Sequence, residues 1–159
     1  MTVQVHVQYA LPERDLPSSV DIKRWAVEAL EGRRTAAQMT VRIVNDNEAA
    51  LLNQTYRHRQ GPTNVLSFPF VLPVQKPTAS DVEDYLGDVV ICASVVAREA
   101  HEQHKELIAH WAHMVVHGSL HLLGYDHLAD EQAQTMEALE TTILARMGYP
   151  DPYHTTKTL

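Results

Sequence analysis

Three histidines lie within eleven residues near the C-terminal end of the chain: His117, His121 and His127. His117 and His121 are four residues apart in an apolar stretch, so a helical turn of 3.6 residues places both imidazoles on one side, about 6 Å apart along the axis. Gly124 comes next, and glycine readily adopts the left-handed conformation that ends a helix and turns the chain back. The spacing therefore predicts a helix and a glycine bend that bring three imidazoles to one point.

Three imidazoles around one point are a typical ligand set for zinc, and they leave the fourth tetrahedral position open for water, as catalytic sites do. We therefore expect one zinc ion per chain, held by His117, His121 and His127. A single helical histidine is more often a core residue with a hydrogen-bond partner. Burying three unpartnered imidazoles among leucines, however, would cost a few kcal/mol, which favours the metal.

Two further histidines, His110 and His113, lie earlier on the same predicted helix. His113 has the four-residue spacing to His117, but it lies about 12 Å from His121 along the axis, whereas zinc–nitrogen bonds are about 2.0 to 2.1 Å long. One ion cannot bind both outer histidines, and the glycine bend favours the later pair. His110 and His113 are therefore predicted to be core or surface histidines.

Gly118 lies between the first two predicted ligands, inside the helix. Glycine there costs roughly 0.8 to 1.0 kcal/mol against alanine, so it provides room either near the metal or for tight packing against a strand. The spacing also matches the zinc protease pattern H-E-x-x-H-x-x-G-x-x-H at every ligand and at the glycine. Gly118 stands where that pattern needs its general-base glutamate, so proteolysis by that route lacks a proton acceptor.

The rest of the chain alternates between strand and helix patterns. Alternating or short apolar runs predict strands, and apolar residues at helical spacing predict helices. Residues 72–84 contain two prolines and are predicted to form a mobile loop. Asn45 to Asn47 and Asp130 offer helix caps. The expected strands are 3–7, 39–44, 64–70 and 86–92, and the expected helices are about 22–30, 49–56, 93–104, 106–123 and 130–147.

This order predicts a mixed α/β (α+β) fold in one domain over residues 1–159, with a single mixed sheet of about four strands and about five helices packed on it. The metal site is expected at the end of a core helix.

The formal net charge of -7 argues against a surface that is cationic overall, so an RNA partner would need a local basic patch. Cys92 is the single cysteine, which fits a reducing cytosol, and no apolar run is long enough to span a membrane.

The run from His117 to His127, HGSLHLLGYDH, resembles the signature of the YbeY family of bacterial metal-dependent endoribonucleases, which act in ribosomal RNA maturation and ribosome quality control. Other blocks are similar to family blocks in the same order, and together they cover nearly the whole chain. These are Tyr56-Arg57, residues 62–69 (PTNVLSFP), Gly87-Asp88, residues 147–149 (MGY) and residues 151–153 (DPY).

The resemblance implies zinc on the three histidines, a role for Arg57 in cutting RNA, and a cytoplasmic role near the small ribosomal subunit, at the 3' end of its RNA. No membrane or DNA partner is expected. Arg57 can pair with a phosphate in fork fashion, while Arg59 or His58 can help to hold a single strand; the alternative for Arg57 is a solvated loop charge. Asp126, next to a ligand, could orient an imidazole or act as a base, or be an ordinary turn aspartate.

Two other functions stay open. The chain could be a zinc-stabilised ribosome-assembly factor that acts by binding, although an open coordination position argues against a purely structural metal. It could also be a metal-dependent hydrolase of another bond, such as an amide, which Gly118 disfavours.

Overall fold

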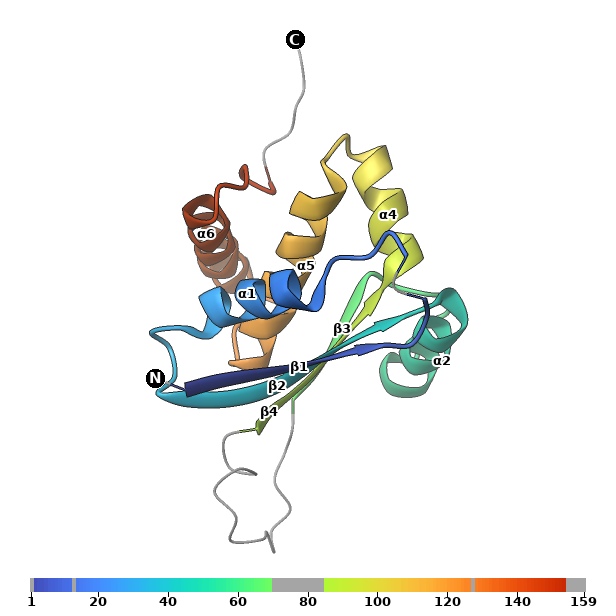
Figure 1. Cartoon of the computed structure of the whole chain (residues 1–159), viewed down its shortest axis with the longest axis horizontal. Coiled ribbons are helices and arrows are strands. Elements are labelled where there is room, and N and C mark those ends of the chain that lie inside the picture. The colour runs from blue at the N-terminus through green and yellow to red at the C-terminus, as the bar shows by residue number, and fades with distance from the viewer. Residues whose placement is uncertain (1, 13, 70–84, 127, 154–159) are drawn as a thin grey trace, which may run out of the picture.

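Four strands form one mixed sheet in the order β1-β2-β4-β3 (Figure 1). The structure is a computed structural model, and it describes residues 2–12, 14–69, 85–126 and 128–153. The neighbouring pairs β1–β2 and β2–β4 are parallel, whereas β3 lies antiparallel to β4 at the sheet edge. The strands are β1 (Thr2–Tyr9), β2 (Ala36–Val44), β3 (Val65–Pro69) and β4 (Tyr85–Cys92).

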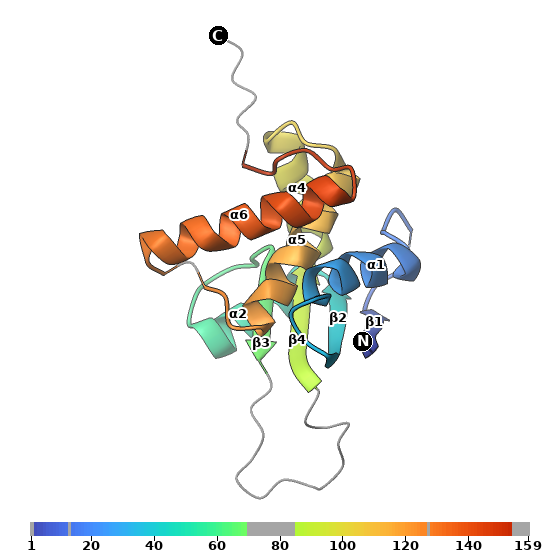
Figure 2. The ribbon, with the colours of Figure 1, turned by 90° about the vertical axis from the view of Figure 1, so that its left-hand side faces the viewer.

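Helix α5 is the central helix of the fold, since it contacts α1, α4, α6 and the strands β3 and β4. Helix α6 lies across α5 on the side away from the sheet, as Figure 2 shows. Among the described residues, the helices are α1 (Ser19–Leu30), α2 (Asp46–Arg57), α4 (Ala93–Glu102), α5 (Leu107–Leu122) and α6 (Asp130–Arg146). The predicted fold class, one four-stranded mixed sheet with helices packed on it, is confirmed.

Side chains that alternate along the strands form two hydrophobic clusters, one on each face of the sheet. Val89 and Ile91 of β4 belong to the larger cluster, with residues of α1, α5 and α6. Val90 lies between them in sequence and belongs to the smaller cluster, which includes Ala49 of α2. Burial on both faces explains why residues 89–92 of this central strand form an uninterrupted apolar run.

Most predicted element ends are confirmed within a few residues. The side chains of Ser18 and Asn45 cap α1 and α2 by accepting hydrogen bonds from backbone N–H groups at 3.2 and 3.0 Å. The predicted cap of α6 was wrong by one residue, because Ala129 is the N-cap and Asp130 begins the helix. A carboxylate in the first turn is favoured there by the helix dipole. The predicted loop 72–84 lies outside the described residues.

Gly118 allows α5 to pack tightly on β4. A Cβ atom at this position would lie 2.5 Å from Cγ1 of Val89 and 3.4 Å from Oγ of Ser67. Val89 is fully buried and β-branched, so it cannot rotate out of the way at low cost. Of the two explanations for this glycine, the structure favours helix–strand packing. The same packing leaves no room for a side chain such as the glutamate that zinc proteases carry at this position.

The substitution Gly118→Ala should therefore destabilise the protein by about 1 to 3 kcal/mol, as overpacking of a filled core does. The direction of the stability change is informative, because inside a helix alanine is otherwise favoured over glycine by roughly 0.8 to 1.0 kcal/mol. Urea unfolding of the variant measures the effect. The double variant Gly118→Ala with Val89→Ala should lose less than the sum of its two single variants, and a more stable Gly118→Ala protein would contradict the close contact.

None of the helices in the described parts of the chain combines the length and the apolar character needed to cross a membrane.

Candidate metal and RNA site

His117 and His121 lie side by side in the last two turns of α5. Their ring centroids are 4.7 Å apart, and both residues are half-buried. The two side chains line a cavity of about 440 Å³. The cavity is bounded by α5, by the end of α2 and by the segment that leads into β3. The described lining residues are Arg57, Thr63, Asn64, Val65, Leu66, Ser67, His117 and His121.

The predicted glycine bend follows directly after α5. Gly124 has a φ of +105°, a value that favours glycine, and its N–H donates to the carbonyl of His121. The N–H of Tyr125 then donates to the carbonyl of Leu120, so the chain folds back over the last turn of the helix. The bend is thus as predicted. His127 lies outside the described residues, and its part in a metal site stays a prediction.

Arg57 is brought to the same cavity although it is 60 residues before His117 in the sequence. It ends α2, donates through Nη2 to the carbonyl of Ser67 at 2.6 Å, and its Cζ lies 5.2 Å from the ring centroid of Phe68. Within the described parts of the chain, Arg57 uses two of its five N–H donors, counting a weaker contact to the carbonyl of Tyr56. The guanidinium is therefore fixed at its position while part of it stays exposed.

The other predicted RNA contacts lie close by on the surface. His58 is exposed and ends α2 in the left-handed conformation, with a φ of 56°. Arg59 follows it and is also exposed. Neither residue lines the cavity. Their predicted role, to help hold an RNA strand, therefore concerns RNA outside the cavity and stays a prediction.

Asp126 is half-buried in the turn after α5 and lines a separate hollow with Glu131, Gln132 and Thr135. Its predicted roles, either to orient an imidazole or act as a base, or to be an ordinary turn aspartate, stay predictions.

A buried carboxylate that the sequence analysis missed lies behind the two histidines. Glu140 of α6 is completely buried, and its Oε2 accepts from Nδ1 of His117 at 2.6 Å, while its Oε1 accepts from Nε2 of His113 at 2.8 Å. The hydroxyl of Tyr153 also donates to Oε1. Burial raises the pKa of Glu140, but the hydrogen bonds from His113 and His117 outweigh it and lower the pKa to about 2.

The sequence contains a signal that would have found Glu140. It lies four residues after Met136 and four before Leu144, both fully buried, so helical spacing places it on the apolar face of α6. A charged residue on such a face is rare unless it is paired. The prediction that His113 is a core histidine was incomplete, because the structure places it in this network.

His113, His117 and Glu140 could by themselves hold a cation, since each offers a ligand atom within 4.8 Å of the others. Two atoms bound to one zinc at about 2.0 to 2.1 Å in tetrahedral geometry lie about 3.3 to 3.4 Å apart. The nitrogen–oxygen distances of 2.6 and 2.8 Å are shorter and have the length of charge-assisted hydrogen bonds. A metal bond from His117 would therefore be made by Nε2, and the pair His117 and His121 fits a metal better than the buried trio.

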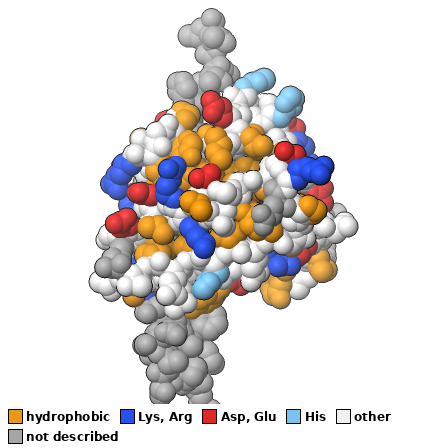
Figure 3. Space-filling view, viewed as in Figure 1, with side chains coloured by type: hydrophobic (Ala, Val, Ile, Leu, Met, Phe, Trp, Pro, Cys, Tyr) orange, Lys and Arg blue, Asp and Glu red, His pale blue; other side chains and the backbone are white. Residues whose placement is uncertain are grey.

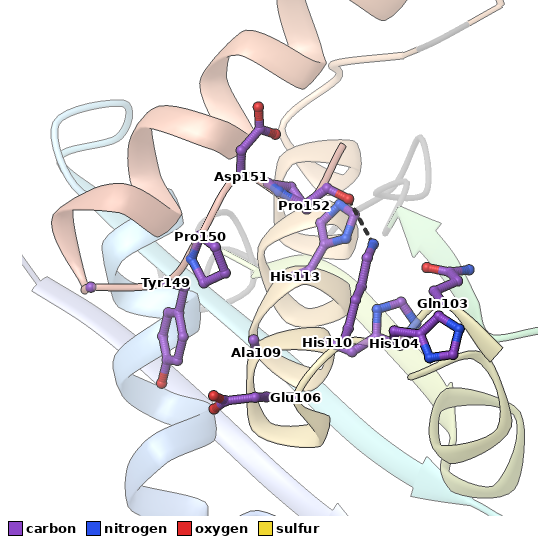
Figure 4. A pocket seen from close by; sticks show the side chains of 12 residues that line it. Gln103, His104, Glu106, Ala109, His110, His113, Tyr149, Pro150, Asp151 and Pro152 are labelled. Carbon is purple, nitrogen blue, oxygen red and sulfur yellow. Dashed lines mark hydrogen bonds between the residues drawn. The ribbon is translucent and has the colours of Figure 1, made fainter. Parts of the chain in front are cut away.

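A second cavity, of about 520 Å³, lies near the N-terminal half of α5 and contains none of the predicted ligands (Figure 4). His110, His113 and the segment Tyr149 to Pro152 line it, and Nζ of Lys105 closes one side by donating to the carbonyl of Pro152 at 2.6 Å. His110 is held by Glu99 at 2.9 Å. His113 thus lines this cavity and also donates to the carboxylate of Glu140.

Comparison with known proteins identifies the family of the chain. The family model described as "Endoribonuclease YbeY" matches residues 12–148 of the chain. The chain belongs to the YbeY family. A curated relative from Nitrosococcus oceani, also named "Endoribonuclease YbeY", is 54% identical over 153 residues, covering 96% of this chain and 98% of its own. The predicted family resemblance is therefore confirmed, and both names agree with the predicted enzyme class of hydrolytic endoribonuclease.

A solved structure shares the fold of this YbeY family member. The solution structure of a Thermotoga maritima protein superposes with a TM-score of 0.56, covers 97% of this chain and 99% of its own, and is 21% identical. At this identity the likeness concerns the fold alone.

Proposed function

We propose that the chain is a zinc-dependent endoribonuclease that cuts single-stranded RNA, with His117, His121 and His127 holding one zinc ion and Arg57 contacting the scissile phosphate. The observation that carries the proposal is that Arg57, His117 and His121 line one cavity. Within the described part of the chain, no Asp or Glu lines it. A cavity with an arginine and no lining carboxylate favours an anionic ligand in a protein whose net charge is -7.

The net charge of -7 implies that RNA would be held by a local cationic contact. On the face shown in Figure 3, basic and acidic side chains are interspersed and form no large positive patch. We expect Arg57, with the exposed His58 and Arg59 next to it, to provide the cationic contact at the cavity.

The proposed metal ion and the residues around it have different chemical roles. A zinc ion bound here would supply Lewis acidity, which activates water and polarises a phosphoryl oxygen. The Ser67 carbonyl and the Phe68 ring hold the guanidinium of Arg57, so its remaining donors can pair with phosphate oxygens and offset the charge that grows in the transition state. Nδ1 of His117 donates to Glu140, and we expect Asp126 to orient an imidazole or to act as a base.

In the cell we expect the substrate to be ribosomal RNA, at the 3' end of the small-subunit RNA, during processing and ribosome quality control in the cytoplasm. The expected partner is the small ribosomal subunit or one of its assembly factors, and one domain over residues 1–159 is expected to carry the activity. The basis is membership of a family named for its endoribonuclease activity.

Metal removal tests the proposal. Purified protein should contain about one zinc per chain by elemental analysis, and a chelator should abolish cleavage of a single-stranded RNA, because the Lewis acid is lost. Added zinc should restore it. A peptide substrate incubated in parallel should stay intact.

Two outcomes would favour the rival functions. RNA left uncut by the zinc-loaded protein, together with unfolding on chelation, would identify a binding factor in which zinc is structural. Cleavage of the peptide but not the RNA would identify a hydrolase of another bond.

A further inference from the structure

The carboxylate of Glu140 is completely buried in α6, where a charged group is costly unless hydrogen bonds satisfy it. Donors from two other elements meet it: His113 and His117 from α5 and Tyr153 from the segment after α6. Its neighbours along the buried face of α6 are Met136, Ile143 and Leu144. Because the carboxylate is not exposed to solvent, these contacts fix the position of its two oxygens.

These contacts determine which nitrogen of His117 carries the proton. A carboxylate accepts hydrogen bonds, so the 2.6 Å contact from Oε2 requires a proton on Nδ1 of His117. A neutral imidazole protonated on Nδ1 has its lone pair on Nε2. His113 and Tyr153 hold the other oxygen, Oε1, and so prevent the carboxylate from rotating away from His117.

We propose that Glu140 is a positioning residue of the metal centre, which holds His117 in the Nδ1-protonated form with Nε2 directed to the metal, while His113 and Tyr153 lock the carboxylate. The inference rests on the proposed zinc site and adds a partner behind it. Metal-ligating histidines commonly donate their second ring N–H to a carboxylate, which fixes the ring and increases its basicity as a ligand.

The test is the zinc affinity of the apo protein, measured by competition with a chromogenic chelator, for the wild type and for Glu140→Gln. Glutamine has nearly the same shape, but its single amide oxygen can accept from only one of the two rings, and the negative charge is lost. We expect the dissociation constant for zinc to rise by about 10- to 100-fold.

Glu99→Gln is the matched control. Glu99 also accepts a hydrogen bond from a histidine of α5, His110 at 2.9 Å, but that histidine is not a proposed ligand. Its zinc affinity should stay within about twofold of the wild type, while urea unfolding of both apo variants separates affinity from stability. A Glu140→Gln protein that is folded and binds zinc as tightly as the wild type would overturn the role of Glu140 and leave the zinc site intact.

A second measurement works without the variant. Long-range ¹H–¹⁵N spectra of the apo wild type should show His117 protonated on Nδ1 at neutral pH, and protonation on Nε2 alone would overturn the inference. A wild-type protein that binds no zinc would overturn both the site and this role. The two failures are therefore distinguishable.

Discussion

The His121→Ala variant is expected to lose RNA cleavage by a factor on the order of 10³ and to bind less than one zinc per chain. His121 lies in the last turn of α5 beside His117, and removing its imidazole leaves the proposed ion with two protein ligands. Loss of several kcal/mol of Lewis-acid stabilisation corresponds to that factor, because each 1.4 kcal/mol is about tenfold in rate. Single-turnover cleavage of a labelled single-stranded RNA and elemental analysis of the same sample measure the two losses together.

His101→Ala is the control for this prediction, because His101 is exposed on α4 and outside the cavity. Its zinc content and cleavage rate should equal those of the wild type. Circular dichroism establishes that both variants are folded. A folded His121→Ala protein that keeps one zinc and full activity would remove His121 from the site and with it the proposed ligand set.

The Arg57→Ala variant should reduce the single-turnover rate by about 10²- to 10³-fold, the usual effect of removing one donor from the developing charge of a transition state. Zinc content should not change, because Arg57 is no ligand. The substitution should have little effect on stability, since the side chain is exposed and its contacts are one strong hydrogen bond to Ser67, a weaker one to Tyr56 and packing on Phe68.

Two further substitutions make this prediction specific. Arg57→Lys keeps the charge but loses the planar fork, so it should recover only part of the rate. Arg98→Ala removes an exposed arginine of α4 that does not line the cavity and should leave the rate unchanged. Turnover by Arg57→Ala at the wild-type rate would remove Arg57 from the chemistry without affecting the metal proposal.

Much of the fold could be predicted because its signals are local. The cap at Asn45, the glycine bend at Gly124 and the alternation of Val3, Val5 and Val7 in β1 each depend on residues that are close together in the sequence. The error at the start of α6 was one residue, since Ala129 and Asp130 compete for the cap and helix ends are set by weak local energies.

The candidate site was only partly predictable, because only some of its contacts are local in the sequence. The pair His117 and His121 follows from helical spacing, whereas the approach of Arg57 to that pair depends on α2 packing on β4 and on β3 packing on α5. Glu140 was missed although its place on the apolar face of α6 was a signal, because only its distance from His117 shows what it does.

The amino-acid sequence alone therefore determined the helix, the glycine bend, the histidine spacing and the mixed α/β class, all of which arise from backbone geometry over a few residues. Only the tertiary structure decided that β3 pairs antiparallel with β4, that Arg57 reaches the histidine cavity, and that Glu140 lies behind His117. These three depend on the packing of α2 and α5 against the sheet and of α6 against α5. Contacts between residues 18 to 60 positions apart are set by which surfaces fit together in the core, and no short pattern in the sequence encodes that fit.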